Sequence, residues 1–192
     1  MSSASVQSKY YSLALWGMVI ILAVSNGLLL RQNLQLRNLL KKFEPDQLKA
    51  GDKLEPFSAS GLNGETVAID FASGGPRRVF MFLSPNCPYC REQFSYWKKL
   101  IDLAPANCFQ VVAVAMNSED RSKLAAYLNT MGYPADSKTF SVALIPEEVR
   151  QKYKFTITPT TLVISSDGKA DAVWTGLLKP SDVEAASAIL GL

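Results

Sequence analysis

The first fifty residues separate into an apolar run and a polar segment of helical pattern. No charged residue occurs between Lys9 and Arg31. A helix of that length, rising 1.5 Å per residue, crosses a hydrocarbon core of roughly 30 Å. From Arg31 to Phe43, leucines recur among Arg, Gln, Asn and Lys, which favours an amphipathic juxtamembrane helix. The pattern therefore predicts a tail at 1–9, a transmembrane anchor at 10–30 and a stalk and linker at 31–50.

The rest of the chain alternates short strand patterns with helical ones. Strand patterns cover 56–60, 66–70, 78–83, 109–116, 142–145, 160–165 and 172–175. Helical patterns run from the Cys87–Cys90 region to about 103, over 119–131 with Ser118 as N-cap, from Pro146 onward and over 180–190. The first two strands flank Gly61-Leu62-Asn63-Gly64 and predict a hairpin. This order predicts an α/β domain at 51–192, with a mainly parallel central sheet covered on both faces and a terminal hairpin as its antiparallel edge.

The composition excludes several kinds of site. The chain has no histidine, which excludes Ser-His and Cys-His pairs and HExxH zinc sites. Arg91 follows Cys90, so covalent haem attachment by CxxCH is excluded as well. Three cysteines alone do not complete a four-thiolate zinc site. A net charge of +3, without a basic stripe among aromatics, gives no reason to expect nucleic acid. We expect no metal, no cofactor and no nucleic-acid partner.

Two of the three cysteines stand three positions apart where a strand gives way to a helix. Cys87-Pro88-Tyr89-Cys90 follows the strand at 78–83 and a short connector. A thiol at a helix N-cap lies near unpaired N–H groups and the positive end of the helix dipole, which favours the reactive thiolate. Pro88 suits the first helical position, because its missing N–H has no partner to lose. The pattern predicts Cys87 and Cys90 as catalytic residues, with the less exposed Cys90 releasing a mixed disulfide formed on Cys87.

From about Gly51 onward the chain resembles the membrane-anchored thioredoxin-like thiol–disulfide oxidoreductases of the TlpA/ResA/MauD group, and MauD especially. The residues that carry the resemblance are 82–90 around the cysteine pair, 159–164 with Asp167-Gly168-Lys169 after it, and the hairpin turn at 61–64. The resemblance implies a thioredoxin-like fold preceded by one transmembrane helix. It also implies reduction or isomerisation of disulfides in cysteine-containing exported client proteins. A membrane or soluble thiol donor would supply the electrons.

Thr158-Pro159 lies about seventy residues after the cysteine pair, just before a strand. The thioredoxin fold has its cis-proline at this place. Backbone beside such a proline faces the reactive sulfur and pairs with an extended substrate segment. We therefore expect Pro88, Tyr89, Thr158 and Pro159 to contact the substrate.

Two positions depart from the patterns of these families. Thioredoxin has a buried aspartate six residues before the first cysteine, and this chain has Met81. ResA-type proteins have a glutamate three residues after the second cysteine, where this chain has Gln93 next to Glu92. Without a buried base, deprotonation of Cys90 would rely on water, on Glu92 or on the substrate.

Thiol peroxidase, copper delivery and client holding are the alternative functions. A peroxiredoxin-like thiol peroxidase needs a proline where this chain has Phe80, counting back from Cys87. A copper-delivery factor of the Sco kind uses CxxxC and a histidine, and this chain has neither. A non-catalytic assembly chaperone, using the same groove to hold a client, stays an alternative. Cys108 is interpreted as a small buried hydrophobe, and the three aromatic residues Phe94, Tyr96 and Trp97 as core or rim.

The side of the membrane on which the domain lies is predicted in two ways. The cations Arg31, Arg37, Lys41 and Lys42 outnumber Lys9 before the anchor, so the positive-inside count favours a cytoplasmic domain. The family resemblance implies instead a single-pass protein with a periplasmic or otherwise extracytoplasmic domain. Ala23-Val24-Ser25 also fits a signal-peptide cleavage site. However, apolar residues resume at 27–30 and favour an uncleaved anchor.

Overall fold

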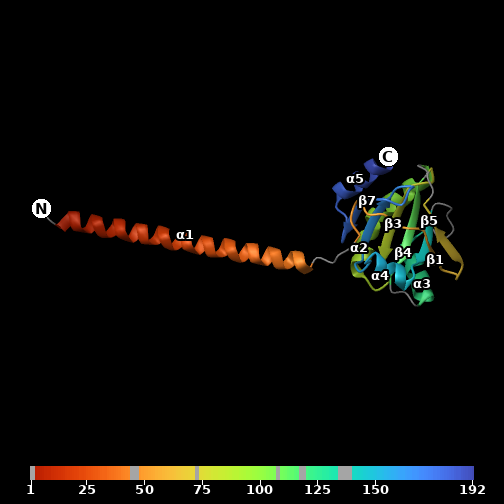
Figure 1. The fold of residues 1–192 in the computed structure, drawn as a ribbon, viewed down its shortest axis with the longest axis horizontal. Coiled ribbons are helices and arrows are strands. Elements are labelled where there is room, and N and C mark those ends of the chain that lie inside the picture. Colours follow the sequence, from red (N-terminus) through yellow and green to blue (C-terminus); the bar gives the residue numbers. More distant parts are fainter. Residues whose placement is uncertain (1–2, 44–47, 72–73, 107–108, 117–119, 134–139) are drawn as a thin grey trace. The chain divides into compact units, whose positions relative to one another are not determined.

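A computed structural model describes residues 3–43, 48–71, 74–106, 109–116, 120–133 and 140–192 (Figure 1). The chain divides into two compact units, Met1–Pro45 and Asp46–Leu192. The helices are α1 Ser3–Phe43, α2 Pro88–Leu103, α3 Arg121–Met131, α4 Glu147–Lys152 and α5 Pro180–Leu190, with a 3₁₀ turn at Ala104–Ala106. The strands are β1 Phe57–Ser60, β2 Thr66–Ile69, β3 Arg78–Leu83, β4 Gln110–Ala115, β5 Phe140–Leu144, β6 Thr160–Ile164 and β7 Ala170–Thr175.

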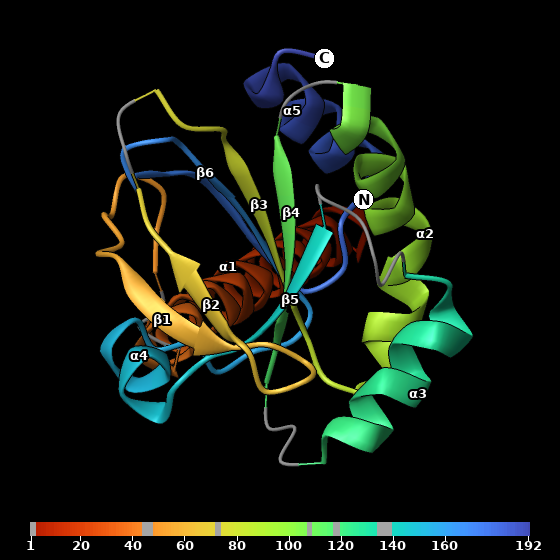
Figure 2. The same ribbon diagram turned by 90° about the vertical axis from the view of Figure 1, so that its right-hand side faces the viewer.

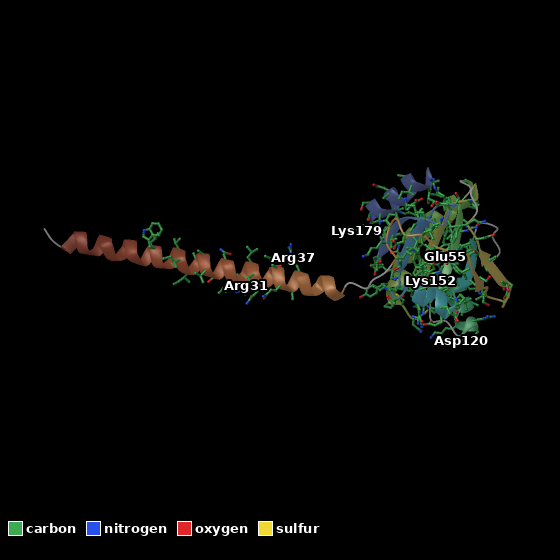
Figure 3. All side chains as sticks on the ribbon, viewed as in Figure 1. Arg31, Arg37, Glu55, Asp120, Lys152 and Lys179 are labelled. Carbon is green, nitrogen blue, oxygen red and sulfur yellow. The ribbon has the colours of Figure 1, made fainter. Side chains whose placement is uncertain are left out.

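The first unit is the single helix α1, so the predicted anchor and stalk form one continuous helix. Within it, Leu15–Arg37 is long and apolar enough to cross a membrane, and none of this segment is buried within the structure. Arg31 and Arg37 project from its second half (Figure 3). The length and composition of α1 fit the predicted anchor; the boundaries given from the sequence stay a prediction.

The second unit is built on a seven-stranded sheet in the order β2-β1-β5-β4-β3-β6-β7 (Figure 2). Only β3, β4 and β5 are parallel to one another, and every other neighbouring pair is antiparallel. The predicted parallel arrangement is confirmed for the three central strands, and the antiparallel part extends from β6 to β7 on one side and from β1 to β2 on the other. Between β5 and β6 the chain forms the short helix α4 of six residues. This connection does not cross back over the sheet, so β6 starts at the end where β5 finishes and runs antiparallel to β3.

Side chains of β3 alternate between the two faces of the sheet, as the period of a strand requires. Val79, Met81 and Leu83 pack in one core cluster with residues of α2, α3 and α5. Phe80 and Phe82 point to the other face, into a cluster with Phe155 and, at its border, residues of α4. Figure 2 shows these helices on opposite sides of the sheet. The predicted coverage of both faces and the predicted hairpins, β1–β2 and β6–β7, are confirmed.

Several boundaries differ from the sequence pattern. The N-cap of α3 is Asp120, whose carboxylate accepts a hydrogen bond from the Lys123 backbone N–H at 3.0 Å. Ser118, predicted for this role, lies outside the described residues. The cap falls on Asp120 because its side chain reaches the exposed N–H group of the first turn.

The end of the predicted linker packs on the domain. Leu48 is buried, and the Gly51 N–H donates to the Ala170 carbonyl at 2.8 Å. Lys152 at the end of α4 pairs with Glu55, as Figure 3 shows. Segment 48–55 is thereby tied both to β7 and to α4.

Candidate active site

The cysteine pair lies where the parallel strand β3 ends and α2 begins. Cys87 is the N-cap of α2, with extended backbone (φ −90°, ψ 112°), and Pro88 occupies the first turn. The Cys87 N–H donates to the Ser84 carbonyl at 3.0 Å, and the Cys90 N–H to the Cys87 carbonyl at 3.2 Å. Because the first N–H groups of a helix lack intrahelical partners, the Cys87 sulfur lies at a site that favours negative charge.

The two thiols differ in exposure. Both are free, and Cys87 is partly exposed whereas Cys90 is fully buried. Cys90 shares its buried face of α2 with Gln93 and Trp97. An external disulfide therefore has access to the Cys87 sulfur before it has access to Cys90.

The chain places Thr158 against the first cysteine, although 71 positions separate them. The Cys87 thiol donates to the Thr158 carbonyl at 3.4 Å. The Thr158–Pro159 peptide bond is cis, as expected from the sequence. The Pro159 carbonyl accepts a hydrogen bond from the Gly176 N–H at 2.8 Å, which ties this loop to the end of β7. Of the predicted substrate contacts, Thr158 touches Cys87, while the Tyr89 side chain is 59% exposed to solvent.

The pKa of the Cys87 thiol lies below its ordinary value. Partial burial, the largest single influence, raises the pKa. Against it act hydrogen bonds from the Cys90 thiol, from the Thr158 side chain and from the backbone of Cys90 and Tyr89, and together they lower it. These bonds favour the charged form of the sulfur. Cys87 is thereby suited to react as a thiolate.

The pKa of Cys90 is raised to about 12. Burial is the main cause, and the hydrogen bond that Cys90 donates to Cys87 adds to it. The arrangement therefore holds one proton on Cys90 and makes Cys87 the more acidic thiol. Such an asymmetric pair supports thiol–disulfide exchange in two steps.

This asymmetry predicts the pH dependence of alkylation. In a Cys108→Ala background, we expect the rate of Cys87 modification by iodoacetamide to rise with pH around a midpoint below the free-thiol pKa of about 8.5. The Cys90→Ala substitution removes the strongest bond that lowers the Cys87 pKa, so the midpoint is expected to move to higher pH. Mass spectrometry at a series of pH values measures both. A wild-type midpoint at or above that of a free thiol would contradict the assignment.

Glu92 is poorly placed to deprotonate Cys90. Its side chain is exposed, next to the buried Gln93 on α2, and adjacent helix positions point about 100° apart. Met81 is fully buried, so the position of the thioredoxin aspartate is apolar. Of water, Glu92 and the substrate, only water and the substrate remain as acceptors of the Cys90 proton.

Two buried side-chain hydrogen bonds hold α2 in place, and the sequence did not reveal them. Trp97 Nε1 donates to Thr161 Oγ1 on β6 at 2.8 Å. Gln93 Oε1 accepts from the Leu178 backbone N–H at 2.7 Å. Trp97 is core, as predicted, and Phe94 and Tyr96 lie partly buried at its border. The partners are 64 and 85 positions away, so no local pattern signals them. Cys108 lies outside the described residues.

The comparisons with known proteins agree with this geometry. The family described as thioredoxin-like domain matches residues 65–188, well over half of the chain. The chain belongs to the thioredoxin-like family. A comparison with curated protein sequences found no match.

Among solved structures, a Chlorobium tepidum protein described as a candidate thiol:disulfide interchange protein DsbE is 28% identical, with a TM-score of 0.60. The match covers 76% of this chain and 98% of that one. StoA from Bacillus subtilis is 18% identical over 69% of this chain and 96% of its own, with a TM-score of 0.55. A secreted Mycobacterium tuberculosis disulfide oxidoreductase is 17% identical over 69% and 95%, also with a TM-score of 0.55. The fold and the oxidoreductase class predicted from the sequence are confirmed.

Proposed function

We propose that this protein exchanges disulfides with cysteine-containing client proteins, with Cys87 as nucleophile and Cys90 as resolving thiol. The observation that carries the proposal is the pairing of a partly exposed N-cap thiol of lowered pKa with a buried thiol of raised pKa. Thiolate reactivity and access are the two properties that the first step of exchange requires. The family to which the chain belongs supports the same chemistry.

The exchange proceeds in two balanced steps when the dithiol meets an oxidised client. The Cys87 thiolate attacks one sulfur of the client disulfide, forming a Cys87–client bond and expelling the other client sulfur as a thiolate that takes up a proton. Cys90 then loses its proton and attacks Cys87, forming the Cys87–Cys90 disulfide and releasing the second client thiolate. The client gains two electrons and this protein loses two, so a thiol donor must restore the dithiol.

The client contact would form along the Thr158-Pro159 loop and the exposed Tyr89. An extended client segment placed beside Thr158 has its cysteine close to Cys87, whose sulfur lies 3.4 Å from the Thr158 carbonyl. Main-chain pairing of this kind depends little on side-chain sequence, whereas an exposed aromatic side chain adds apolar contact. Pro88 is exposed beside Tyr89, whereas Pro159 is buried next to Thr158 and would act by shaping the loop.

We further propose that α1 anchors the domain to the membrane as a single-pass helix, with the domain on the extracytoplasmic side. The exposed apolar segment Leu15–Arg37 supports the anchor. An oxidising compartment is where client disulfides persist and need reduction or isomerisation. The resemblance to MauD supports a role in the maturation of an exported protein.

A Cys90→Ser variant tests the function directly. Without the resolving thiol, the Cys87–client disulfide is expected to accumulate and to appear in non-reducing gels of membranes as adducts that vanish on reduction. The matched control, Cys87→Ser with Cys90 intact, is expected to capture none. Mass spectrometry of the adducts would name the clients. If Cys90→Ser captures no client while the protein still supports its biological role, a client-holding chaperone function would replace this proposal.

A further inference from the structure

Three buried polar side-chain atoms of the described residues lack a hydrogen-bond partner, and they gather in one layer of the fold. They are Gln93 Nε2, Tyr127 OH and Tyr133 OH. Gln93 is fully buried, and Tyr127 and Tyr133 are 6% and 5% exposed. A buried donor without a partner costs on the order of 1–3 kcal/mol. Three of them together in one small domain call for a physical reason.

All three side chains are buried on the side of the sheet that holds the buried thiol Cys90. Gln93 follows Cys90 by three positions on the buried face of α2, where side chains at that spacing are neighbours. Tyr127 comes from α3 and stands beside Tyr133, with ring centroids 6.5 Å apart. Tyr133 in turn packs on Phe94 of α2, at 4.7 Å between ring centroids. Cys90, Tyr127 and Tyr133 belong to the same core cluster.

Electrostatics link the two phenols to the thiol. Burial raises the pKa of both tyrosines, and a negative charge on Cys90 raises each of them further. Cys87 acts on Tyr127 in the same sense, while the nearby Arg91 acts weakly in the opposite one. Both phenols therefore keep their protons when Cys90 is charged. They are hydrogen-bond donors in this setting and not bases.

Ionisation of Cys90 would give the unpartnered donors a strong hydrogen-bond acceptor, the thiolate sulfur. The protonated thiol is a weak acceptor, whereas a thiolate is an anion that accepts several hydrogen bonds. Donors that lack a partner in the ground state and form a hydrogen bond in the reacting state stabilise the transition state more than the ground state. Stabilising the thiolate would assist the ionisation of Cys90. For that step position 81 has the apolar Met81 and the carboxylate of Glu92 is exposed.

We propose that Tyr127 OH and Gln93 Nε2 stabilise the Cys90 thiolate during its attack on the mixed disulfide. The proposal rests on the function proposed above and concerns its second step. In that step the Cys90 proton passes to solvent, the thiolate attacks the Cys87 sulfur, the Cys87–Cys90 bond forms and the client sulfur leaves with the bonding electron pair. The two donors bind the sulfur while it is charged and are released when the disulfide has formed.

Stopped-flow reaction with the aromatic disulfide DTNB separates the two steps. The full chain, reduced, in detergent micelles and in a Cys108→Ala background, is expected to release a first thionitrobenzoate when Cys87 attacks and a second when Cys90 resolves the adduct. In Tyr127→Phe we expect the second phase to slow about tenfold, equivalent to about 1.4 kcal/mol, and the first phase to stay unchanged. Gln93→Met is expected to slow the same phase. Tyr96→Phe, a tyrosine of α2 at the border of the core, is the matched control and should alter neither phase.

The pH dependence of the second phase separates this role from a purely structural one. Tyr127→Phe removes an unpartnered hydroxyl and keeps the ring, so the variant is expected to be at least as stable as the wild type. Its second-phase midpoint should move to higher pH, because the thiolate loses a donor. An unchanged second phase in Tyr127→Phe, or a slower one without a shifted midpoint, would overturn the proposal. A wild type that shows no first phase would contradict the proposed function itself.

Discussion

Replacing Cys87 with serine is expected to reduce disulfide exchange on the order of 10³-fold or more, to the level of the uncatalysed reaction. A hydroxyl at the N-cap has no accessible anionic form near neutral pH and no sulfur with which to form a mixed disulfide. The remaining thiol, Cys90, is fully buried with a pKa raised to about 12, so it does not substitute for Cys87. Reduction of insulin or of a disulfide-bonded peptide, followed by turbidity or fluorescence, measures the loss.

Cys90→Ser in the same assay is the informative companion to Cys87→Ser. It is expected to keep the first, stoichiometric reaction with substrate and to lose turnover, whereas Cys87→Ser loses both. The Cys87→Ser substitution is expected to leave the site folded, because the Cys87 side chain makes no capping hydrogen bond to α2 that it would break. Residual turnover in Cys87→Ser within tenfold of the wild type would refute the assignment of Cys87 as nucleophile.

Trp97→Ala is expected to cause the largest loss of stability, about 3–5 kcal/mol of the free energy of unfolding. Trp97 is fully buried beneath the active site, so the substitution leaves a cavity between α2 and the sheet. It also removes the donor to Thr161 Oγ1, which is left without that hydrogen bond in the interior. Denaturant unfolding of the reduced full chain in detergent, followed by circular dichroism, measures the change.

Two further tryptophan variants separate the causes of that loss. Trp97→Phe restores most of the volume without the indole N–H, so its smaller deficit reports the hydrogen bond to Thr161. Trp16→Ala makes the same change as Trp97→Ala at a tryptophan of α1 that is 65% exposed, and it should leave unfolding of the domain nearly unaltered. A deficit below about 1 kcal/mol in Trp97→Ala would show that α2 does not depend on this side chain.

The limits of a strand depend on nearby residues, whereas its direction in the sheet does not. β3 was predicted with its observed limits because six consecutive residues favour a strand and a turn precedes them. The direction of β6 was not predictable in that way. It depends on whether a connection returns across the sheet, and the connection that contains α4 does not. A pattern of alternating strands and helices by itself suggests the parallel arrangement that the structure limits to three strands.

The sequence alone predicted the local setting of the cysteine pair. The strand, the connector, the N-cap Cys87 and Pro88 are contiguous, and helix-end effects act within one turn, so adjacent residues contain all the necessary information. Only the tertiary structure decided what surrounds that pair: the Thr158 carbonyl against Cys87, the hydrogen bond from Leu178 N–H to Gln93, and Tyr127 of α3 in the same core cluster as Cys90. These contacts join segments distant in the chain, and they arise because packing of the helices on the sheet brings them together.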